Sequence, residues 1–263
     1  MYVDLDGTLI KSDLMFESIL ILLKKNLFFL FAIPIWLLKG RPYLKLQLAK
    51  RVQVPIEQVP VNAEFHEFLQ KEKERGRKLV LISASNQTAV EQVSSHFDLF
   101  NECFGSNEST NLKANNKLAR IQELNNGESF SYAGNSSEDL PIWKQSAEVL
   151  LVNCSQSLER KIKTTNTKSF DSAPSQFNKL LETMRPHQWL KNLLVFVPLI
   201  LSHQISKLDL LFLSIIAYVS FCLCASSVYL LNDMLDLKSD RQHITKSKRA
   251  FAAGELSFAT GFF

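Results

Sequence analysis

Short apolar runs separated by polar segments fill the N-terminal part of the chain, and longer apolar runs fill the C-terminal part. Four short runs, at residues 1–4, 78–83, 130–133 and 149–152, are each followed by polar residues and predict buried strands. The stretches between them predict helices. Strands that alternate with helices are typical of an α/β fold with a doubly wound, mainly parallel sheet.

The first and second predicted strands are separated by a long segment, 14–50, that we expect to be helical. Its apolar stretch, residues 27–38, is interrupted by Pro34. Twelve residues are too few to cross about 30 Å of hydrocarbon. We interpret this stretch as a buried helix of an inserted cap, and contact with a membrane surface is the alternative.

The C-terminal part contains apolar segments of membrane-spanning character. Residues 210–231 are 22 consecutive residues without a charge, and a shorter apolar segment precedes them. We therefore predict transmembrane helices at about 187–205 and 210–231. Basic residues flank both outer ends, which by the positive-inside rule predicts a multi-pass protein of the inner or plasma membrane. The N-terminal domain and the loop at 232–249 would then face the cytoplasm.

These patterns predict three regions: an α/β domain at 1–155, a linker at 156–182 rich in Ser, Thr, Asn and Lys, and an all-α membrane domain at 183–263. The chain has 263 residues and a net charge of +4. The average composition excludes a collagen or a disordered tail, and the charge is too small to indicate a nucleic-acid partner.

Two carboxylates follow the first predicted strand, in Asp4-Leu5-Asp6-Gly7-Thr8. One carboxylate can attack a phosphorus atom while the other protonates the leaving oxygen. The hydroxyl of Thr8 and nearby amides can hold phosphate oxygens. Further polar clusters follow the later strands at 83–86 and 134–139. Because the carboxyl ends of parallel strands meet at one edge of a sheet, we expect all three clusters to form one site.

Over residues 1–155 this pattern resembles the haloacid dehalogenase-like (HAD) phosphatases. The resemblance implies that Asp4 is the nucleophile that becomes an aspartyl phosphate and that Asp6 is the general acid/base. It also implies that Ser83, in the second motif, binds the transferring phosphoryl group. A lysine of the third motif would neutralise that group. We assign this lysine to Lys117, which opens the helix expected at 117–124, with Lys113 as the alternative.

The fourth motif of that family corresponds to Gly134-Asn135-Ser136-Ser137-Glu138-Asp139. The resemblance implies a Mg²⁺ site formed by Asp4, Asp6, Asn135 and Asp139. The family usually has aspartate where this chain has Asn135, whose neutral carbonyl oxygen is still a hard ligand.

A second cluster of acidic residues directly follows the longer apolar segment: Asn232, Asp233, Asp236 and Asp240. On a continuous helix, residues 232, 236 and 240 would form one stripe with 233 beside it. Carboxylates so close together repel one another unless a cation lies among them, and Mg²⁺ can also bind a diphosphate. A solvated turn at the membrane edge is the alternative.

This segment resembles the first aspartate-rich motif, N-D-x-x-D-x-x-x-D, of the UbiA-type intramembrane prenyltransferases. The opening of the segment, 185–192, resembles the branch of decaprenyl-phosphate phosphoribosyltransferases, some of which follow a HAD domain. The resemblance implies transfer of a 5-phosphoribosyl group from phosphoribosyl diphosphate to a polyprenyl phosphate. A prenyl diphosphate is the alternative substrate. Mg²⁺ would lie on Asp233, Asp236 and Asp240. The residues expected to bind the diphosphate or substrate are Lys191, Asn192, Asn232, Arg241 and Lys248.

From the proximity of the two domains, and not from any residue, we hypothesise that the HAD domain removes the 5-phosphate from the transferase product. Proteins of the UbiA type carry a second aspartate-rich motif far downstream, and these 263 residues contain none. We therefore expect an incomplete transferase. The alternatives are a membrane-tethered, Mg²⁺-dependent phosphatase and an inactive remnant.

Overall fold

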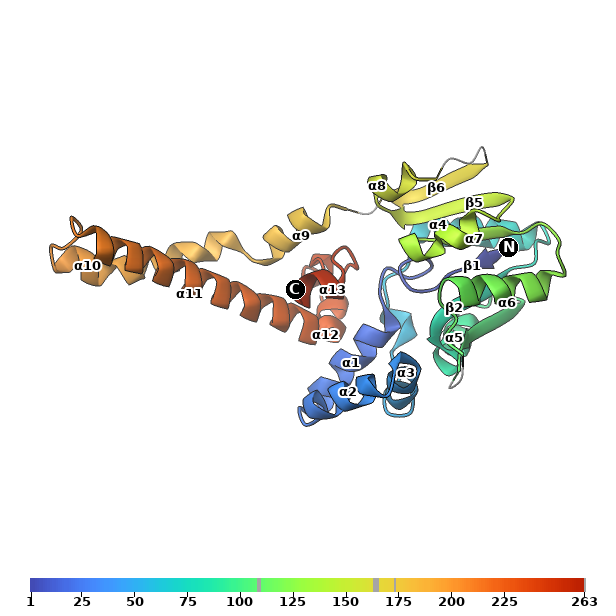
Figure 1. Cartoon of the computed structure of the whole chain (residues 1–263), viewed down its shortest axis with the longest axis horizontal. Helices are drawn as coiled ribbons and strands as arrows, with labels where there is room; N and C mark the ends of the chain where they lie inside the picture. The colour runs from blue at the N-terminus through green and yellow to red at the C-terminus, as the bar shows by residue number, and fades with distance from the viewer. Residues whose placement is uncertain (108–109, 163–165, 173, 263) are drawn as a thin grey trace. The chain divides into compact units, whose positions relative to one another are not determined.

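The computed structural model describes residues 1–107, 110–162, 166–172 and 174–262. The chain divides into two compact units, Met1–Ala173 and Pro174–Phe263 (Figure 1). The N-terminal unit contains every strand found in the described residues.

A six-stranded parallel sheet in the order β3-β2-β1-β4-β5-β6 forms the centre of the N-terminal unit. It confirms the predicted doubly wound α/β architecture. The carboxyl ends of β1, β2 and β4, which are neighbours in the sheet, therefore meet at one edge. The strands are β1 (Tyr2–Val3), β2 (Val80–Asn86), β3 (Glu102–Ser106), β4 (Ser131–Gly134), β5 (Glu148–Cys154) and β6 (Thr167–Ser172).

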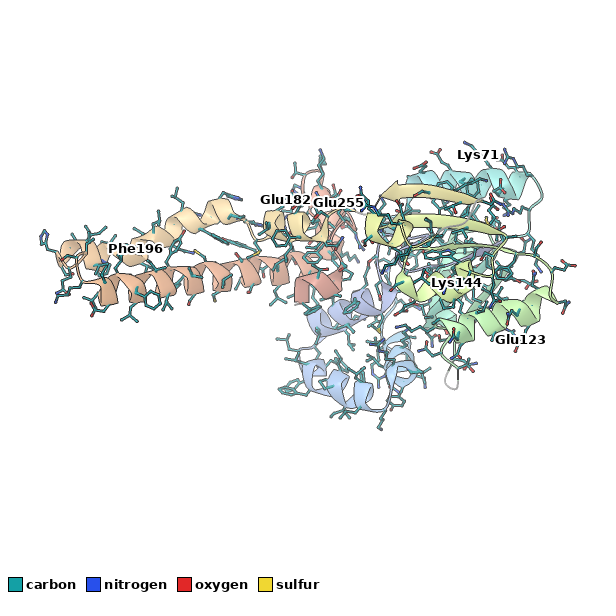
Figure 2. All side chains as sticks on the ribbon, turned by 45° about the horizontal axis from the view of Figure 1, so that its top comes forward. Lys71, Glu123, Lys144, Glu182, Phe196 and Glu255 are labelled. Carbon is teal, nitrogen blue, oxygen red and sulfur yellow. The ribbon has the colours of Figure 1, made fainter. Side chains whose placement is uncertain are left out.

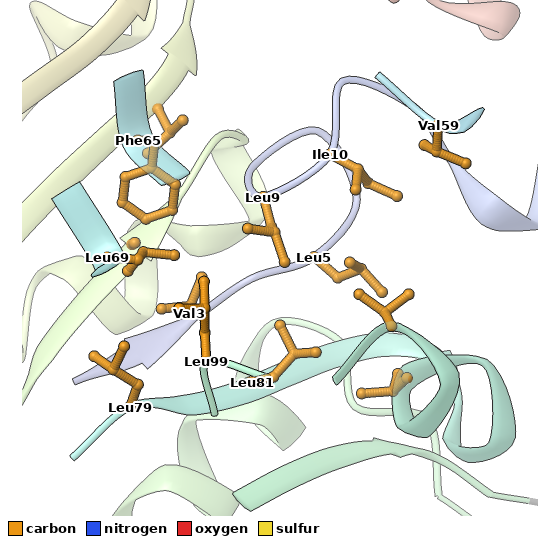
Figure 3. Packing of buried hydrophobic residues seen from close by; sticks show 14 of the residues in the cluster. Val3, Leu5, Leu9, Ile10, Val59, Phe65, Leu69, Leu79, Leu81 and Leu99 are labelled. Atoms are coloured by element: carbon orange, nitrogen blue, oxygen red, sulfur yellow. The ribbon is translucent and has the colours of Figure 1, made fainter. Parts of the chain in front are cut away.

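Alternating side chains of the strands bury two apolar layers, one on each face of the sheet. Val3 points into one layer with Phe65 and Leu69 (Figure 3). Tyr132 and Trp143 lie in the other. The helices of this unit are α1 (Leu14–Lys25), α2 (Phe29–Leu38), α3 (Arg41–Ala49), α4 (Ala63–Glu74), α5 (Gln87–Phe97), α6 (Asn115–Asn125), α7 (Leu140–Trp143) and α8 (Gln156–Glu159), with 3-10 turns η1 (Ile56–Gln58) and η2 (Ser137–Asp139).

Helices α1, α2 and α3 form the predicted cap between β1 and β2. They pack around a small apolar cluster of Leu22, Leu44, Leu48 and Val52. The interpretation of residues 27–38 as a buried helix is wrong, because no residue of α2 is buried. Phe29, Ile33 and Trp36 pack on this cluster from one face of α2, whereas Phe31, Ile35 and Leu38 are exposed.

The predicted linker at 156–182 is also corrected by the structure. Its first part forms α8 and β6, and β6 pairs in parallel with β5 as an edge strand of the sheet. Leu158 of α8 enters one core layer and Phe170 of β6 enters the other. An edge strand pairs with one neighbour only and can be polar in sequence. For this reason the polar composition of 156–182 suggested a linker.

The C-terminal unit is helical. Its elements are α9 (Gln176–Thr183), η3 (Pro186–Phe196), α10 (Val197–Leu201), α11 (Leu208–Leu235), α12 (Leu237–Gln242), η4 (Lys246–Lys248) and α13 (Phe258–Phe262). Among the described residues, α11 is the one helix long and apolar enough to cross a membrane. Side chains project from it along its whole length (Figure 2). It starts before and ends after the predicted range of 210–231.

The other predicted transmembrane helix, at about 187–205, is not a continuous α-helix. The chain forms the 3-10 helix η3 and then the short helix α10, which ends at Leu201. Pro198 lies in the first turn of α10. Because proline lacks an N–H donor, which the first turn of a helix does not need, Pro198 favours a helix start at this point over an uninterrupted helix.

An ion-pair network at the amino-terminal edge of the sheet leads to a stability prediction. The guanidinium of Arg77 donates to Glu72 at 2.7 Å and to Glu148 at 2.6 Å. Both carboxylates are largely buried, with side chains 8% and 12% exposed. Replacing Arg77 by methionine is expected to lower the free energy of unfolding by about 2 kcal/mol, because both carboxylates lose a partner.

Thermal unfolding would measure this loss, and Arg75→Met is the matched control. Arg75 also pairs with Glu72, but its own side chain is 73% exposed, so the control should cost no more than about 0.5 kcal/mol. Burial alone would raise the pKa of Glu148, but Arg77, Lys168 and Ser131 hold it at about 2. The stabilisation is therefore present above about pH 4.5 and lost as the pH falls towards 2. Equal losses in the two variants would contradict the prediction.

Candidate functional site

A cavity of about 370 Å³ opens at the carboxyl ends of the central strands. It confirms that the three polar clusters of the sequence meet at one edge of the sheet. The cap contributes to its wall from α1 and α3. The charged and hydrogen-bonding residues that line it include Asp4, Asp6, Asp13, Arg41, Lys45, Ser83, Ser85, Lys113, Lys117, Asn135 and Asp139.

Asp4 and Lys117 form a buried ion pair at the base of this cavity. The Nζ atom of Lys117 lies 2.8 Å from Oδ1 of Asp4 and 3.0 Å from the hydroxyl of Tyr132. Lys117 lies in the first turn of α6, which aims its long side chain under the end of β1. The alternative, Lys113, instead pairs with Glu138 at 2.6 Å. The structure therefore places Lys117, and not Lys113, beside Asp4.

Asp6 is fixed by three donors from two segments. Its Oδ1 accepts from the backbone N–H of Leu14 at 2.9 Å. Its Oδ2 accepts from the hydroxyls of Ser83 at 3.1 Å and Ser85 at 2.6 Å. Ser83 therefore lies where the sequence predicts it. Ser85 was missed, although alternation along β2 places it on the same face as Ser83.

Asp139 is buried, and its carboxylate is occupied by hydrogen bonds within the protein. Its side chain is 3% exposed and accepts from the Tyr132 hydroxyl at 2.7 Å and from the backbone N–H groups of Asn135 and Ser136. Its Oδ1 lies 3.8 Å from Nζ of Lys117. Asp139 thus holds the loop after β4 and helps to position Lys117.

The prediction that Thr8 binds phosphate does not fit the structure. Thr8 is completely buried, its hydroxyl has no hydrogen-bond partner, and it is not part of the cavity wall. The turn after Asp6 is made by Gly7, whose φ of +78° suits glycine. This turn directs Thr8 into the core. A Cβ at position 7 would overlap the side chain of Asn135, so the fourth cluster packs directly on the first.

Burial raises the pKa of Asp4 to about 7. Lys117 opposes this rise, while the carboxylates of Asp139 and Asp6 add to it. Asp4 therefore ionises near neutral pH, and the charge of Lys117 is what keeps its anionic form accessible in a buried site.

Asp13, at the start of the cap, gives a pH-dependent prediction. Its carboxylate caps α1, accepting from the backbone N–H groups of Met15 and Phe16. Burial and the nearby charge of Asp6 raise its pKa to about 7. A carboxyl group whose pKa is raised on folding stabilises below its unfolded pKa of about 4. That stabilisation is lost as the pH rises through about 7.

Replacing Asp13 by asparagine keeps a good helix cap but removes the charge. The variant is expected to be more stable than the parent chain by about 1 kcal/mol at about pH 8, and equal to it within error at about pH 3.5. The expected gain in stability is small because the side chain of Asp13 is only half-buried, and solvent screens its charge. Thermal unfolding at the two pH values measures the difference. A variant that is less stable at the higher pH would contradict the raised pKa.

The donors of this cavity suit Mg²⁺ in number and chemistry. Mg²⁺ is usually held by one or two carboxylates, with water and phosphate oxygens completing its shell. Here the carboxylates of Asp4 and Asp6 and the amide oxygen of Asn135 are such donors. Within the described ranges, no group of three His, Cys, Asp or Glu side chains is arranged to hold a metal ion. Asn135 would therefore supply a neutral third ligand.

The aspartates of the C-terminal unit lie around the junction of two helices. Helix α11 ends at Leu235 and α12 starts at Leu237, while backbone hydrogen bonds from Asp236 to Asn232 and from Asp240 to Asp236 run across the junction. Asp233 and Asp240 are buried, whereas Asp236 is exposed. The expected stripe of Asn232, Asp236 and Asp240 stays a prediction.

Two arginines neutralise the buried aspartates. Arg185 donates to both oxygens of Asp233, at 2.7 and 3.0 Å. Arg249 bridges the pair, at 3.0 Å from Asp233 and 2.8 Å from Asp240. Sequence analysis did not predict that either arginine pairs with these aspartates. Both arginines lie in segments that resemble the family's motifs, and their positive charge was the only sign of this role.

Two of the residues predicted to bind diphosphate have other hydrogen-bond partners in the structure. Arg241 donates to the carbonyl of Ala252, and Asn192 donates to the sulfur of Cys222. Lys191, Asn232 and Lys248 are exposed. Their predicted role in binding a diphosphate stays a prediction.

Comparisons with known proteins match the two parts of the chain to different kinds of protein. No family model matches it. An uncharacterised protein of Sinorhizobium fredii, y4nM, is 36% identical over 98% of this chain. The chain spans 51% of that relative. A decaprenyl-phosphate phosphoribosyltransferase of Mycolicibacterium smegmatis is 42% identical over 79 residues, which are 28% of this chain and 25% of that protein.

Solved structures with similar coordinates match the N-terminal part. A protein of unknown function from Bordetella pertussis has a TM-score of 0.49 and 14% identity, covering 65% of this chain and 96% of that one. A HAD-family hydrolase from Salmonella enterica has a TM-score of 0.47 and 15% identity, covering 61% and 64%. The transferase similarity covers a different stretch of about 80 residues. The chain thus joins a doubly wound α/β domain to a segment similar in sequence to decaprenyl-phosphate phosphoribosyltransferases.

Proposed function

We propose that the N-terminal unit is a Mg²⁺-dependent phosphatase of phosphate monoesters. The observation that carries the proposal is the buried contact between Asp4 and Lys117, at 2.8 Å. In the same cavity two serine hydroxyls donate to Asp6, the carboxyl group proposed as general acid. An ionised Asp4 carboxylate attacks phosphorus and forms an aspartyl phosphate, while the ester oxygen leaves with a proton from Asp6. Water then attacks the phosphorus, Asp6 takes back a proton, and inorganic phosphate leaves.

The residues around Asp4 supply the charge that this reaction needs. Lys117 neutralises the phosphoryl oxygens, and the Ser83 hydroxyl turns from Asp6 to the phosphoryl group. When bound, Mg²⁺ would be held by Asp4, Asp6 and Asn135 and would supply further positive charge. Arg41 and Lys45 add two cations from the cap side of the same cavity. We therefore expect the rest of the substrate to be anionic as well.

Phosphate release from a panel of phosphate monoesters by the full chain in detergent tests this proposal. Turnover is expected with Mg²⁺ and should stop with a chelator. The variant Asp6→Asn is expected to accumulate a phosphorylated enzyme that hydroxylamine cleaves, since acyl phosphates react with it. Absence of both turnover and a phosphorylated enzyme across the panel would refute the proposal.

The C-terminal unit suggests a second function, transfer of a phosphoribosyl group to a polyprenyl phosphate at a membrane. The similarity to decaprenyl-phosphate phosphoribosyltransferases and the paired carboxylates at the end of α11 favour it. In such a transfer, a lipid phosphate oxygen bonds to the anomeric carbon as the bond to the diphosphate breaks. The N-terminal unit would then remove the 5-phosphate of that product. Helix α11 would anchor the chain in the inner or plasma membrane, with the N-terminal unit in the cytoplasm.

Binding of phosphoribosyl diphosphate measures this second function without requiring turnover. Calorimetry on the full chain with Mg²⁺ is expected to show binding that Asp233→Asn weakens by at least about tenfold. The matched control is Asp209→Asn, at the other end of α11. Equal affinity in the two variants would argue against a diphosphate site at Asp233.

A further inference from the structure

Helix α2 of the cap is apolar along its whole length, and it is not buried. Its sequence, Phe-Leu-Phe-Ala-Ile-Pro-Ile-Trp-Leu-Leu, contains no polar side chain, and none of its residues is buried. In soluble proteins a helix that is apolar on all sides normally lies inside a core. The helix therefore needs an apolar partner beyond the cap.

One face of α2 already has its partner. Phe29, Ile33 and Trp36, spaced by four and three residues, pack on the apolar cluster of the cap. A second row, shifted around the helix, points away from that cluster. It consists of Phe28, Phe31, Ile35 and Leu38, which are 79%, 71%, 56% and 88% exposed. We call these four residues the outer row.

The surroundings of the outer row are strongly basic. From residue 18 to residue 56 the chain contains no Asp or Glu and seven Lys or Arg residues. Lys25 lies just before α2, and Lys39 and Arg41 follow it, all three exposed. Large apolar side chains bordered by cations are typical of helices that lie in the headgroup region of anionic membranes.

We propose that α2 is an interfacial membrane helix, with its outer row in the acyl-chain boundary and its flanking bases on anionic headgroups. Ten residues of α-helix are about 15 Å long, about half of the hydrocarbon thickness, so α2 lies along the surface and does not cross. Helix α11 would keep the chain at a bilayer. The inference rests on that proposed anchoring and not on the phosphatase activity.

The consequence for function concerns the substrate. The cap that carries α2 also supplies Asp13, Arg41 and Lys45 to the wall of the cavity. A cap held on the membrane brings the cavity to lipid headgroups. The substrate class it favours is a phosphate monoester on a membrane-anchored molecule.

The depth of a spin label on α2 tests the proposal in the full chain. The label is attached at Phe31→Cys after serine replaces Cys224, which is exposed, and Cys103, which is partly exposed. The matched control carries the label at Glu123→Cys on α6, an exposed position labelled in Figure 2. Both proteins are reconstituted into phosphatidylcholine bilayers with and without phosphatidylglycerol. Collision rates with oxygen, which enters lipid, and with a water-soluble nickel chelate are then compared.

The expected result is a ratio of oxygen to nickel collisions several-fold higher at position 31 than at position 123. Phosphatidylglycerol should increase the ratio, and Lys25→Gln with Lys39→Gln should reduce it. A ratio equal to that of the control would place α2 in water. Low collision rates with both reagents would place it against protein, either the C-terminal unit or a second copy. Either result would overturn the proposal, and neither depends on phosphatase turnover.

Discussion

Replacing Asp4 by asparagine is expected to lower phosphate release by at least about 10³-fold while leaving the fold intact. The amide nitrogen and oxygen keep the shape of the side chain, but they cannot attack phosphorus to give an acyl phosphate. Because burial raises the pKa of Asp4 to about 7, its charge does not favour folding at neutral pH, and the variant should fold. Release of inorganic phosphate measures the rate.

The matched control for this variant is Asp98→Asn. Asp98 is exposed and has the left-handed φ of 48°, a conformation that asparagine also adopts well. The control should keep full activity. Substantial residual activity in Asp4→Asn would show that another group attacks the phosphorus, and would remove Asp4 from the role of nucleophile.

Replacing Lys117 by methionine is expected to damage both stability and activity. The ammonium group is buried between the carboxylates of Asp4, at 2.8 Å, and Asp139, at 3.8 Å. Without it the two carboxylates repel each other in a desolvated site. We expect a loss of about 3 kcal/mol in the free energy of unfolding at about pH 8. Activity should fall by at least about 10²-fold, because no cation remains beside the phosphoryl oxygens.

Two comparisons separate this effect from a general loss of charge. Lys113→Met removes the other candidate lysine, whose pair with Glu138 lies at the cavity edge and is about half-exposed, and should cost no more than about 0.5 kcal/mol. The double variant Asp4→Asn with Lys117→Met should lose less free energy of unfolding than the two single variants lose together, because it removes one of the two repelling carboxylates. Thermal unfolding of the parent chain, the three single variants and the double variant measures these losses. Additive losses would contradict direct coupling between residues 4 and 117.

The order of strands and polar clusters made the N-terminal site predictable from sequence. Each cluster follows an apolar run, and parallel pairing then forces Asp4, Ser83 and Asn135 to one edge of the sheet. The strands that sequence missed, β3 and β6, are the two edges of the sheet. Edge strands bury little surface, so their sequences carry a weaker apolar pattern. A fragment cut before β6, for example at residue 160, would therefore lack one edge strand of the sheet.

The sequence by itself determined which residue types lie at the ends of the central strands, since apolar periodicity fixes strands and motif spacing fixes the order of the acids. Tertiary structure alone decided the environment of each side chain. It buried Thr8 away from the cavity and placed Lys117, and not Lys113, beside Asp4. It also left the outer row of α2 exposed. It also buried Asp233 and Asp240, paired both with arginines, and left Asp236 exposed. Such contacts join residues distant in the chain, and their geometry depends on how helices turn and pack, which a local pattern does not encode.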